Sequence, residues 1–164
     1  MKQKCFTWLV IACLLFGSVP VSAAYDQTHE NQWSQFPVQK QNGSQRTYEA
    51  TYAVQKILRY YSDEYGNNYY KSSLDGSFGS GTLKAVKSYQ EYWGLTPDGS
   101  VGPNTWRTMY RDSSLFTPDS TSTAYYYGTY TTYPNKVSII RYNYNTKSWQ
   151  VALEDGGWMS FEWY

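Results

Sequence analysis

Apolar residues recur at helical spacing between residues 47 and 61. They lie three or four positions apart, which predicts a helix with one buried side. Thr47 precedes the pattern and is a suitable N-cap, because its hydroxyl can accept a bond from a backbone amide of the first turn. The apolar positions are Tyr52, Val54, Ile57, Leu58 and Tyr61.

Two further helices are predicted downstream. Residues 81–93 place Leu83, Val86 and Trp93 on one side of a helix, and Gly94 is a residue type that commonly ends one. A shorter helix over residues 103–110 directs Trp106 and Met109 inward. By their helical phase, we assign both tryptophans to the core.

After residue 123 the pattern changes from helical spacing to alternation. Residues 137–144 alternate, residues 145–148 form a hairpin loop, and Trp149 and Val151 share one face of the following strand. Residues 154–157 read as a second turn before a last strand over 158–164, and residues 125–133 are a candidate fourth strand. We therefore predict a small antiparallel β meander over residues 124–164, which at three or four strands needs a packing partner.

A short motif occurs twice between the predicted helices. Residues 75–82 read DGSFGSGT, and residues 98–105, 23 positions later, read DGSVGPNT. Asp-Gly is a strong turn signal, because glycine adopts positive φ without strain and the aspartate side chain can bond nearby amides. Phe78 and Val101 would be single apolar residues that hold each loop on the core. Gly102 and Pro103 suit a helix cap and first turn.

The stretch DGSFGSGTLKAVKSYQEYWGLTPDGSVGPNTWRTM, residues 75–109, resembles the peptidoglycan-binding domain of the peptidoglycan-binding-1 type. Val54-Gln55-Lys56-Ile57-Leu58 is similar to the first helix of that family. The resemblance implies a mainly α, three-helix domain over residues 47–111, so the fold class is α+β overall. The polar loop of residues 62–73 is longer than this family would lead us to expect.

The resemblance also implies a binding groove beside the two Asp-Gly loops. Peptidoglycan presents sugar faces, amides and carboxylates, which suit aromatic rings together with amide and hydroxyl groups. Our candidate binding residues are Ser77, Tyr92, Ser100 and Asn104, with Asp75 and Asp98 shaping the loops. A calcium loop is the alternative for the two aspartates, but glycine and apolar residues stand where oxygen ligands would be needed, so turn formation is preferred.

Residues 1–24 read as a secretory signal peptide. Lys2 and Lys4 precede an apolar run over residues 6–16, and small residues follow at 21–24. The run is short for a membrane span. Residues 10–13 resemble a lipobox with Cys13 as a lipidation site, although the apolar run continues beyond it. Cys5 is the other cysteine, so the mature chain would have no disulfide.

Two segments read as connectors. Residues 25–46 are rich in Gln, Asn and Ser, which predicts a flexible polar arm in which His29 is solvated, with Trp33 and Phe36 able to dock on the domain. Residues 112–123 are rich in Ser and Thr and read as a linker.

Composition and charge exclude several function classes. With 14 Lys and Arg against 13 Asp and Glu, the chain lacks the basic surface that nucleic-acid binding requires. A single histidine supplies neither a His-rich zinc site nor a credible serine triad. Two carboxylate pairs, at residues 63–64 and 154–155, are better explained as turn charges than as a glycosidase pair. We predict no catalytic residues, no metal and no cofactor.

The sequence therefore predicts a secreted, extracellular, cell-wall-associated binding protein without enzymatic activity. Its partner would be the glycan strand or the stem peptide of peptidoglycan, with no nucleic acid and no membrane span. Aromatic residues make up 20% of the chain, and the tyrosine-rich β segment could bind a protein partner. Two alternatives stay open: a small wall hydrolase with catalytic residues in the C-terminal segment, and a protein–protein module that recruits a wall enzyme.

Overall fold

The computed structural model of the chain describes residues 27–44, 47–61, 67–116, 124–132 and 135–161. The predicted signal peptide lies outside these ranges. The four helices are α1 (Gln27–Trp33), α2 (Tyr48–Tyr60), α3 (Ser80–Tyr92) and α4 (Pro103–Asp112). The strands are β1 (Ser114–Phe116), β2 (Ala124–Thr132), β3 (Asn135–Asn143), β4 (Ser148–Ala152) and β5 (Trp158–Phe161). None of the helices in these ranges combines the length and apolar composition needed to cross a membrane.

The three predicted helices begin and end close to the capping residues that the sequence indicates. The hydroxyl of Thr47 accepts a 3.2 Å bond from the amide of Ala50 and so caps α2. Gly102 and Pro103 begin α4, and Gly94, with φ of 70°, follows the end of α3. Because these signals are local, the sequence locates the helices to within two residues.

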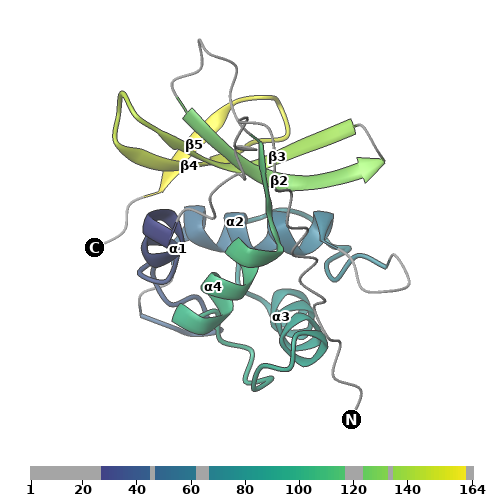
Figure 1. The fold of residues 1–164 in the computed structure, drawn as a ribbon. Helices are drawn as coiled ribbons and strands as arrows, with labels where there is room; N and C mark the ends of the chain where they lie inside the picture. The colour runs from purple at the N-terminus through teal and green to yellow at the C-terminus, as the bar shows by residue number, and fades with distance from the viewer. Residues whose placement is uncertain (1–26, 45–46, 62–66, 117–123, 133–134, 162–164) are drawn as a thin grey trace, which may run out of the picture.

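The strands form one antiparallel sheet in the order β1-β2-β3-β4-β5. Each strand pairs with the next in the chain, with Ile140 opposite Val151 and Trp149 opposite Phe161, so the sheet is a meander. Figure 1 shows the sheet lying as a second layer over the helices, with α2 directly beneath it. The α+β class is confirmed. The predicted linker is wrong at residues 114–116, which form β1 and pair with β2.

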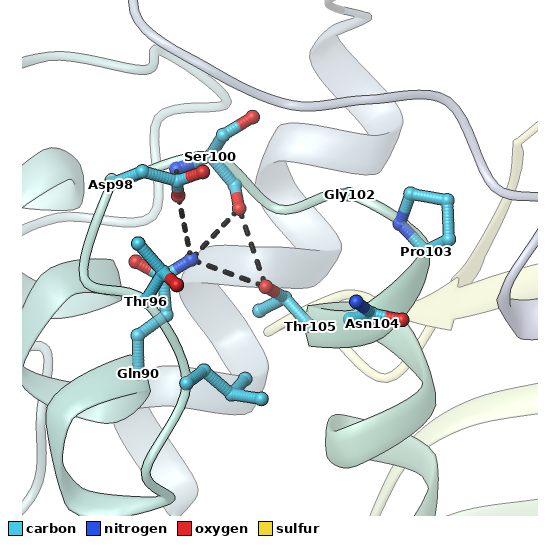
Figure 2. A pocket seen from close by; sticks show the side chains of 9 residues that line it. Gln90, Thr96, Asp98, Ser100, Gly102, Pro103, Asn104 and Thr105 are labelled. Carbon is cyan, nitrogen blue, oxygen red and sulfur yellow. Dashed lines mark hydrogen bonds between the residues drawn. The ribbon is translucent and has the colours of Figure 1, made fainter.

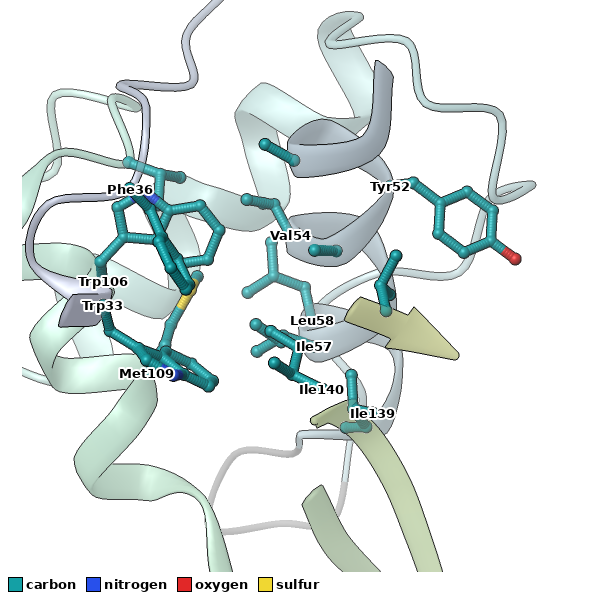
Figure 3. Close-up of a cluster of buried hydrophobic side chains, with 14 of the residues drawn as sticks. Trp33, Phe36, Tyr52, Val54, Ile57, Leu58, Trp106, Met109, Ile139 and Ile140 are labelled. Carbon is teal, nitrogen blue, oxygen red and sulfur yellow. The ribbon is translucent and has the colours of Figure 1, made fainter. Parts of the chain in front are cut away.

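Helix α2 is buried on more than one side. Nine consecutive residues, 50–58, are buried, because the sheet covers one face while α3 and the first Asp-Gly loop cover others. Lys56 is 4% exposed, and its ammonium donates to the carbonyl of Ala152 in β4. Burial lowers the pKa of Lys56. The α2–sheet interface therefore contains a hydrogen-bonded ammonium. Its apolar side chains include Ile57 and Leu58 of α2 and Ile140 of β3 (Figure 3).

The segment predicted as a flexible arm folds onto the domain instead. Residues 27–33 form α1, and the side chains of Trp33 and Phe36 are 1% and 2% exposed. Their rings meet Trp106 of α4 at centroid distances of 6.3 and 5.2 Å (Figure 3). The indole of Trp106 also donates a 3.2 Å bond to the carbonyl of Pro37. The expectation of a flexible arm was therefore wrong, whereas Trp33 and Phe36 do dock on the domain and complete its core.

His29 is buried as well, which overturns its expected solvation. It is 5% exposed, its Nδ1 is hydrogen-bonded to the hydroxyl of Tyr127, and its ring lies 5.2 Å from that of Trp149. Beside it, the carboxylate of Glu30 pairs at 2.6 Å with Arg111 of α4. Helix α1 is therefore held to both the sheet and α4.

Replacement of Trp33 by Ala tests the docking of α1. The variant loses a fully buried indole and leaves a cavity against α4 and the sheet, so we expect the free energy of unfolding to fall by about 3–5 kcal/mol. Chemical denaturation measures this change. Asn31→Ala, at an exposed position of the same helix, is the control and should change stability by less than about 0.5 kcal/mol. Equal effects from the two variants would contradict the packing described.

Candidate functional site

The first Asp-Gly loop is organised by one side-chain amide from α2. Gln55, fully buried, directs its Nε2 to Asp75 Oδ1 at 2.7 Å, to the carbonyl of Ser77 at 2.9 Å and to Thr82 Oγ1 at 3.1 Å. Its Oε1 accepts from the amides of Asp75 and Gly76 at 3.1 and 2.9 Å. One amide thus satisfies both donors and acceptors of the loop and reaches the first turn of α3.

The second Asp-Gly loop repeats this arrangement from α3. Gln90 directs its Nε2 to Asp98 Oδ1 at 2.9 Å, to the carbonyl of Ser100 at 2.9 Å and to Thr105 Oγ1 at 3.2 Å. Its Oε1 accepts from the amide of Gly99 at 2.8 Å. The repeat seen in sequence is therefore a repeated hydrogen-bond network, and the two glutamines are the residues that the search for binding side chains missed. Gln55 stands 20 residues before Asp75 and Gln90 stands 8 residues before Asp98, so the signal that they share is a position on the helix that precedes each loop.

Each loop requires its glycine for two reasons. Gly76 and Gly99 have φ of 63° and 76°, a region that L side chains rarely adopt. A Cβ at Gly76 would lie 2.2 Å from the ring of Tyr48, and one at Gly99 would lie 2.3 Å from Leu83 Cδ1. The loops therefore lie directly on the helices that precede them.

A pocket opens beside the second loop, at the beginning of α4. Its volume is about 490 Å³, and amide, hydroxyl and carboxylate groups gather on its wall around a few apolar side chains (Figure 2). Asn104 is exposed at its edge, and Ser100 is partly exposed. The lining residues are Gln90, Leu95, Thr96, Asp98, Ser100, Gly102, Pro103, Asn104 and Thr105.

The six predicted binding residues do not come together in this pocket. Asp98, Ser100 and Asn104 line it, whereas Asp75, Ser77 and Tyr92 are not among its lining residues. Thr82 at the first loop and Gln90 at the second lie eight residues apart on α3, which is about 12 Å along the helix axis.

The first loop differs from the second in what precedes it. Gly81 occupies the position in the repeat that Asn104 has at the pocket. A Cβ at Gly81 would lie 3.4 Å from Ser72 Oγ and 4.0 Å from the ring of Tyr70. Side chains from the segment that precedes the first loop therefore reach this position. Tyr70, which belongs to the polar loop of residues 62–73, is 4% exposed. The same local motif therefore has different surroundings in its two copies.

The two aspartates act in turn formation. Asp98 Oδ1 accepts from the amide of Ser100 at 2.7 Å, and Asp75 Oδ1 from the amide of Ser77 at 2.9 Å. The bonds from Gln55 and from that backbone amide lower the pKa of Asp75, since they stabilise its ionised form. No group of three or more potential metal-ligating side chains occurs within the described part of the chain.

The two tryptophans that the sequence assigned to the core differ in their burial. Trp106 is fully buried, as predicted, but Trp93 is 36% exposed and the assignment was wrong. Helix α3 ends at Tyr92, so Trp93 is the C-cap with ψ of 4° and leaves the helical phase on which the prediction relied. The carboxyl of Asp112 in α4 lies near Trp93, and burial raises the pKa of that carboxyl to about 6.

Replacement of Gln90 by Leu should lower the free energy of unfolding by about 2–3 kcal/mol, because the Gly99 amide and the Asp98 carboxylate lose a buried partner. Urea denaturation measures the loss, and faster amide exchange at Gly99 locates it. Glu91→Gln, at the exposed neighbouring position, serves as the control. Unchanged exchange at Gly99 would show that the loop does not depend on this amide.

Asp112 predicts a pH dependence of stability. Its pKa is about 6 in the folded protein against an ordinary value of 3.8, so the folded state binds the proton more tightly than the unfolded chain does. Stability should therefore increase as the pH falls from about 6 to about 4, by up to about 3 kcal/mol, with partial exposure reducing this value. Asp112→Asn should flatten the profile in this window, whereas Asp155→Asn in an exposed turn should leave it unchanged; thermal unfolding across pH decides.

Comparison with known proteins shows that residues 47–109 match the family model PG_binding_1, a peptidoglycan binding domain. The chain is 47% identical over 51 residues to an uncharacterized protein from the bpoA1 3′ region of Kitasatospora aureofaciens, over 30% of this chain and 43% of that protein. It is 46% identical over 46 residues to the N-acetylmuramoyl-L-alanine amidase CwlM of Mycobacterium tuberculosis, over 28% of this chain and 11% of that protein.

The chain thus spans less than half the length of these curated relatives. No solved structure matches it. The family match begins at the cap of α2 and ends within α4, so it includes both glutamines and both Asp-Gly loops. The family resemblance that the motif series indicated is confirmed for residues 47–109.

Proposed function

We propose that this chain is an exported, non-catalytic protein that attaches to bacterial cell-wall peptidoglycan. The observation that carries the proposal is the family match over residues 47–109 together with an open polar pocket inside the matched segment. Export rests on the sequence of residues 1–24, and wall association then follows from the binding domain.

The chemistry of the pocket suits the amide-rich parts of peptidoglycan. Asn104 offers an exposed amide that both donates and accepts, and Ser100, which is partly exposed, adds a hydroxyl. Leu95 and Pro103 supply apolar contacts at the same wall. N-acetyl groups and stem peptides both present amides beside small apolar groups, so either fits such a wall.

Several contacts support a binding role over catalysis. The single histidine, His29, is buried between α1 and the sheet, far from the second loop in sequence and engaged by Tyr127. In the carboxylate pair at residues 154–155, Glu154 pairs with Arg59 at 2.8 Å, and Asp155 accepts from the Gly157 amide at 2.9 Å. CwlM is an amidase, and the similarity to it covers 11% of that enzyme.

The proposal predicts that the mature chain, residues 25–164, sediments with purified peptidoglycan and releases no soluble muropeptides. Ser100→Ala and Asn104→Ala should each weaken the association about fivefold, because each removes hydrogen bonds worth about 1 kcal/mol. Sedimentation measures the affinity, and chromatography of the supernatant detects any cleavage.

Two further variants sharpen this test. Asn145→Ala, at an exposed position between β3 and β4, is the matched control for Asn104→Ala and should bind like the unmodified chain. Ser77→Ala makes the same chemical change as Ser100→Ala in the first loop, so its effect decides whether Asp75 and Ser77 belong to the binding surface. Failure of the unmodified chain to sediment would overturn the binding proposal, and release of muropeptides would overturn its non-catalytic part.

A further inference from the structure

Two consecutive aromatic side chains at the end of α3 are exposed. Tyr92 and Trp93 are 37% and 36% exposed, their ring centroids lie 5.4 Å apart, and their planes are nearly perpendicular at 87°. The other large exposed hydrophobic side chains of the described residues are Tyr48 and Tyr144, in α2 and after β3. Tyr92 and Trp93 therefore form a compact aromatic patch.

This patch rests on two further tyrosines. Tyr89 is fully buried, and Tyr69 packs edge-on against Tyr89 at 5.3 Å and against Tyr92 at 6.0 Å. Trp93 lies 6.3 Å from Tyr89. We call these four residues, Tyr69, Tyr89, Tyr92 and Trp93, the aromatic shelf. The edge-on contacts limit rotation of the outer rings.

A carboxylate from another helix anchors the shelf. Asp112 of α4 accepts a 3.4 Å bond at Oδ2 from the hydroxyl of Tyr89, the buried ring that Trp93 packs against at 6.3 Å. Placing a carboxyl in this setting has a desolvation cost. The carboxyl therefore ties the buried ring of the shelf to α4.

The size and surroundings of the shelf select the kind of ligand. A stable protein interface buries about 800 Å² on each partner, which is far more than two partly exposed rings provide. Exposed polar residues flank the rings on α3, at Ser88 and Glu91. A pyranose ring has an apolar C–H face of the size of one aromatic ring and hydroxyls around its edge, and it suits a small rigid aromatic surface with a polar rim.

We propose that the aromatic shelf is a saccharide-binding subsite that stacks an N-acetylated sugar ring of a glycan strand. The identity of the glycan as peptidoglycan rests on the proposed function. Only Gly94 separates Trp93 from Leu95, which lines the polar pocket, so the shelf and the pocket flank the same end of α3. The shelf binds sugar faces, and the pocket binds amide and peptide groups.

The test uses the mature chain, residues 25–164, and the β-1,4-linked tetramer of N-acetylglucosamine as the probe. Titration is followed by tryptophan fluorescence and by the chemical shift of the Trp93 indole proton. Trp93→Ala and Tyr92→Ala should each weaken tetramer binding at least tenfold. Trp93→Phe, which keeps an aromatic face, should stay within about threefold of the unmodified chain.

Tyr144→Ala is the matched control, because Tyr144 is 45% exposed and lies outside the shelf. It should leave tetramer binding unchanged. Asp112→Asn tests positioning: a weaker affinity with a changed indole shift in the free protein is expected, because the carboxyl holds Tyr89, against which Trp93 packs. Circular dichroism identifies any variant that fails to fold, and the indole shift of the unmodified chain locates the ligand without any mutation.

The outcomes separate this proposal from the proposed function. The shelf proposal is overturned if the unmodified chain does not bind the tetramer. It is also overturned if Trp93→Ala and Tyr92→Ala bind the tetramer as tightly as the unmodified chain does. Tetramer binding that moves the Trp93 indole shift, with no sedimentation on peptidoglycan, supports the shelf and overturns peptidoglycan as its source of glycan. Sedimentation on peptidoglycan without tetramer binding leaves the wall-binding proposal standing and removes the saccharide subsite.

Discussion

The helical part of this protein depends on two buried primary amides. Gln55 and Gln90 each bind an Asp-Gly loop and the first turn of the next helix. In the second loop Val101 pairs with Gln39, and the remaining amides and carbonyls of both loops need partners once they lie on the helices. A glutamine side chain supplies a donor and an acceptor together, so α2 fixes the start of α3, and α3 fixes the start of α4.

Much of this arrangement follows from local sequence signals. Capping residues and helical spacing located α2, α3 and α4, and turn residues separated β3, β4 and β5, because each signal acts within a few residues. Helix α1 could not be found in this way. Seven residues rich in Gln and Asn do not form a stable helix in isolation, and the burial of Trp33 depends on Trp106 and Trp149, which are distant in sequence.

The candidate site shows the same limit. The repeat gave both Asp-Gly loops with their glycines, and it predicted three of the residues that line the pocket. It could not distinguish the two copies, because the difference arises from Ser72 and Tyr70, which reach Gly81 from outside the motif. Trp93 was misplaced because helical phase holds only inside a helix, and Trp93 is the C-cap residue that follows α3.

The docking of α1 has a consequence for how the family segment is handled. The segment that matches the family, residues 47–109, contains Trp106, yet the side chains that enclose this indole, Trp33 and Phe36, precede the segment. The sheet that covers α2 follows it. A fragment of residues 47–109 would expose to solvent an indole and aliphatic side chains that are buried in the whole chain. The unit that recurs among proteins by sequence is therefore smaller than the unit that shares one core in this chain.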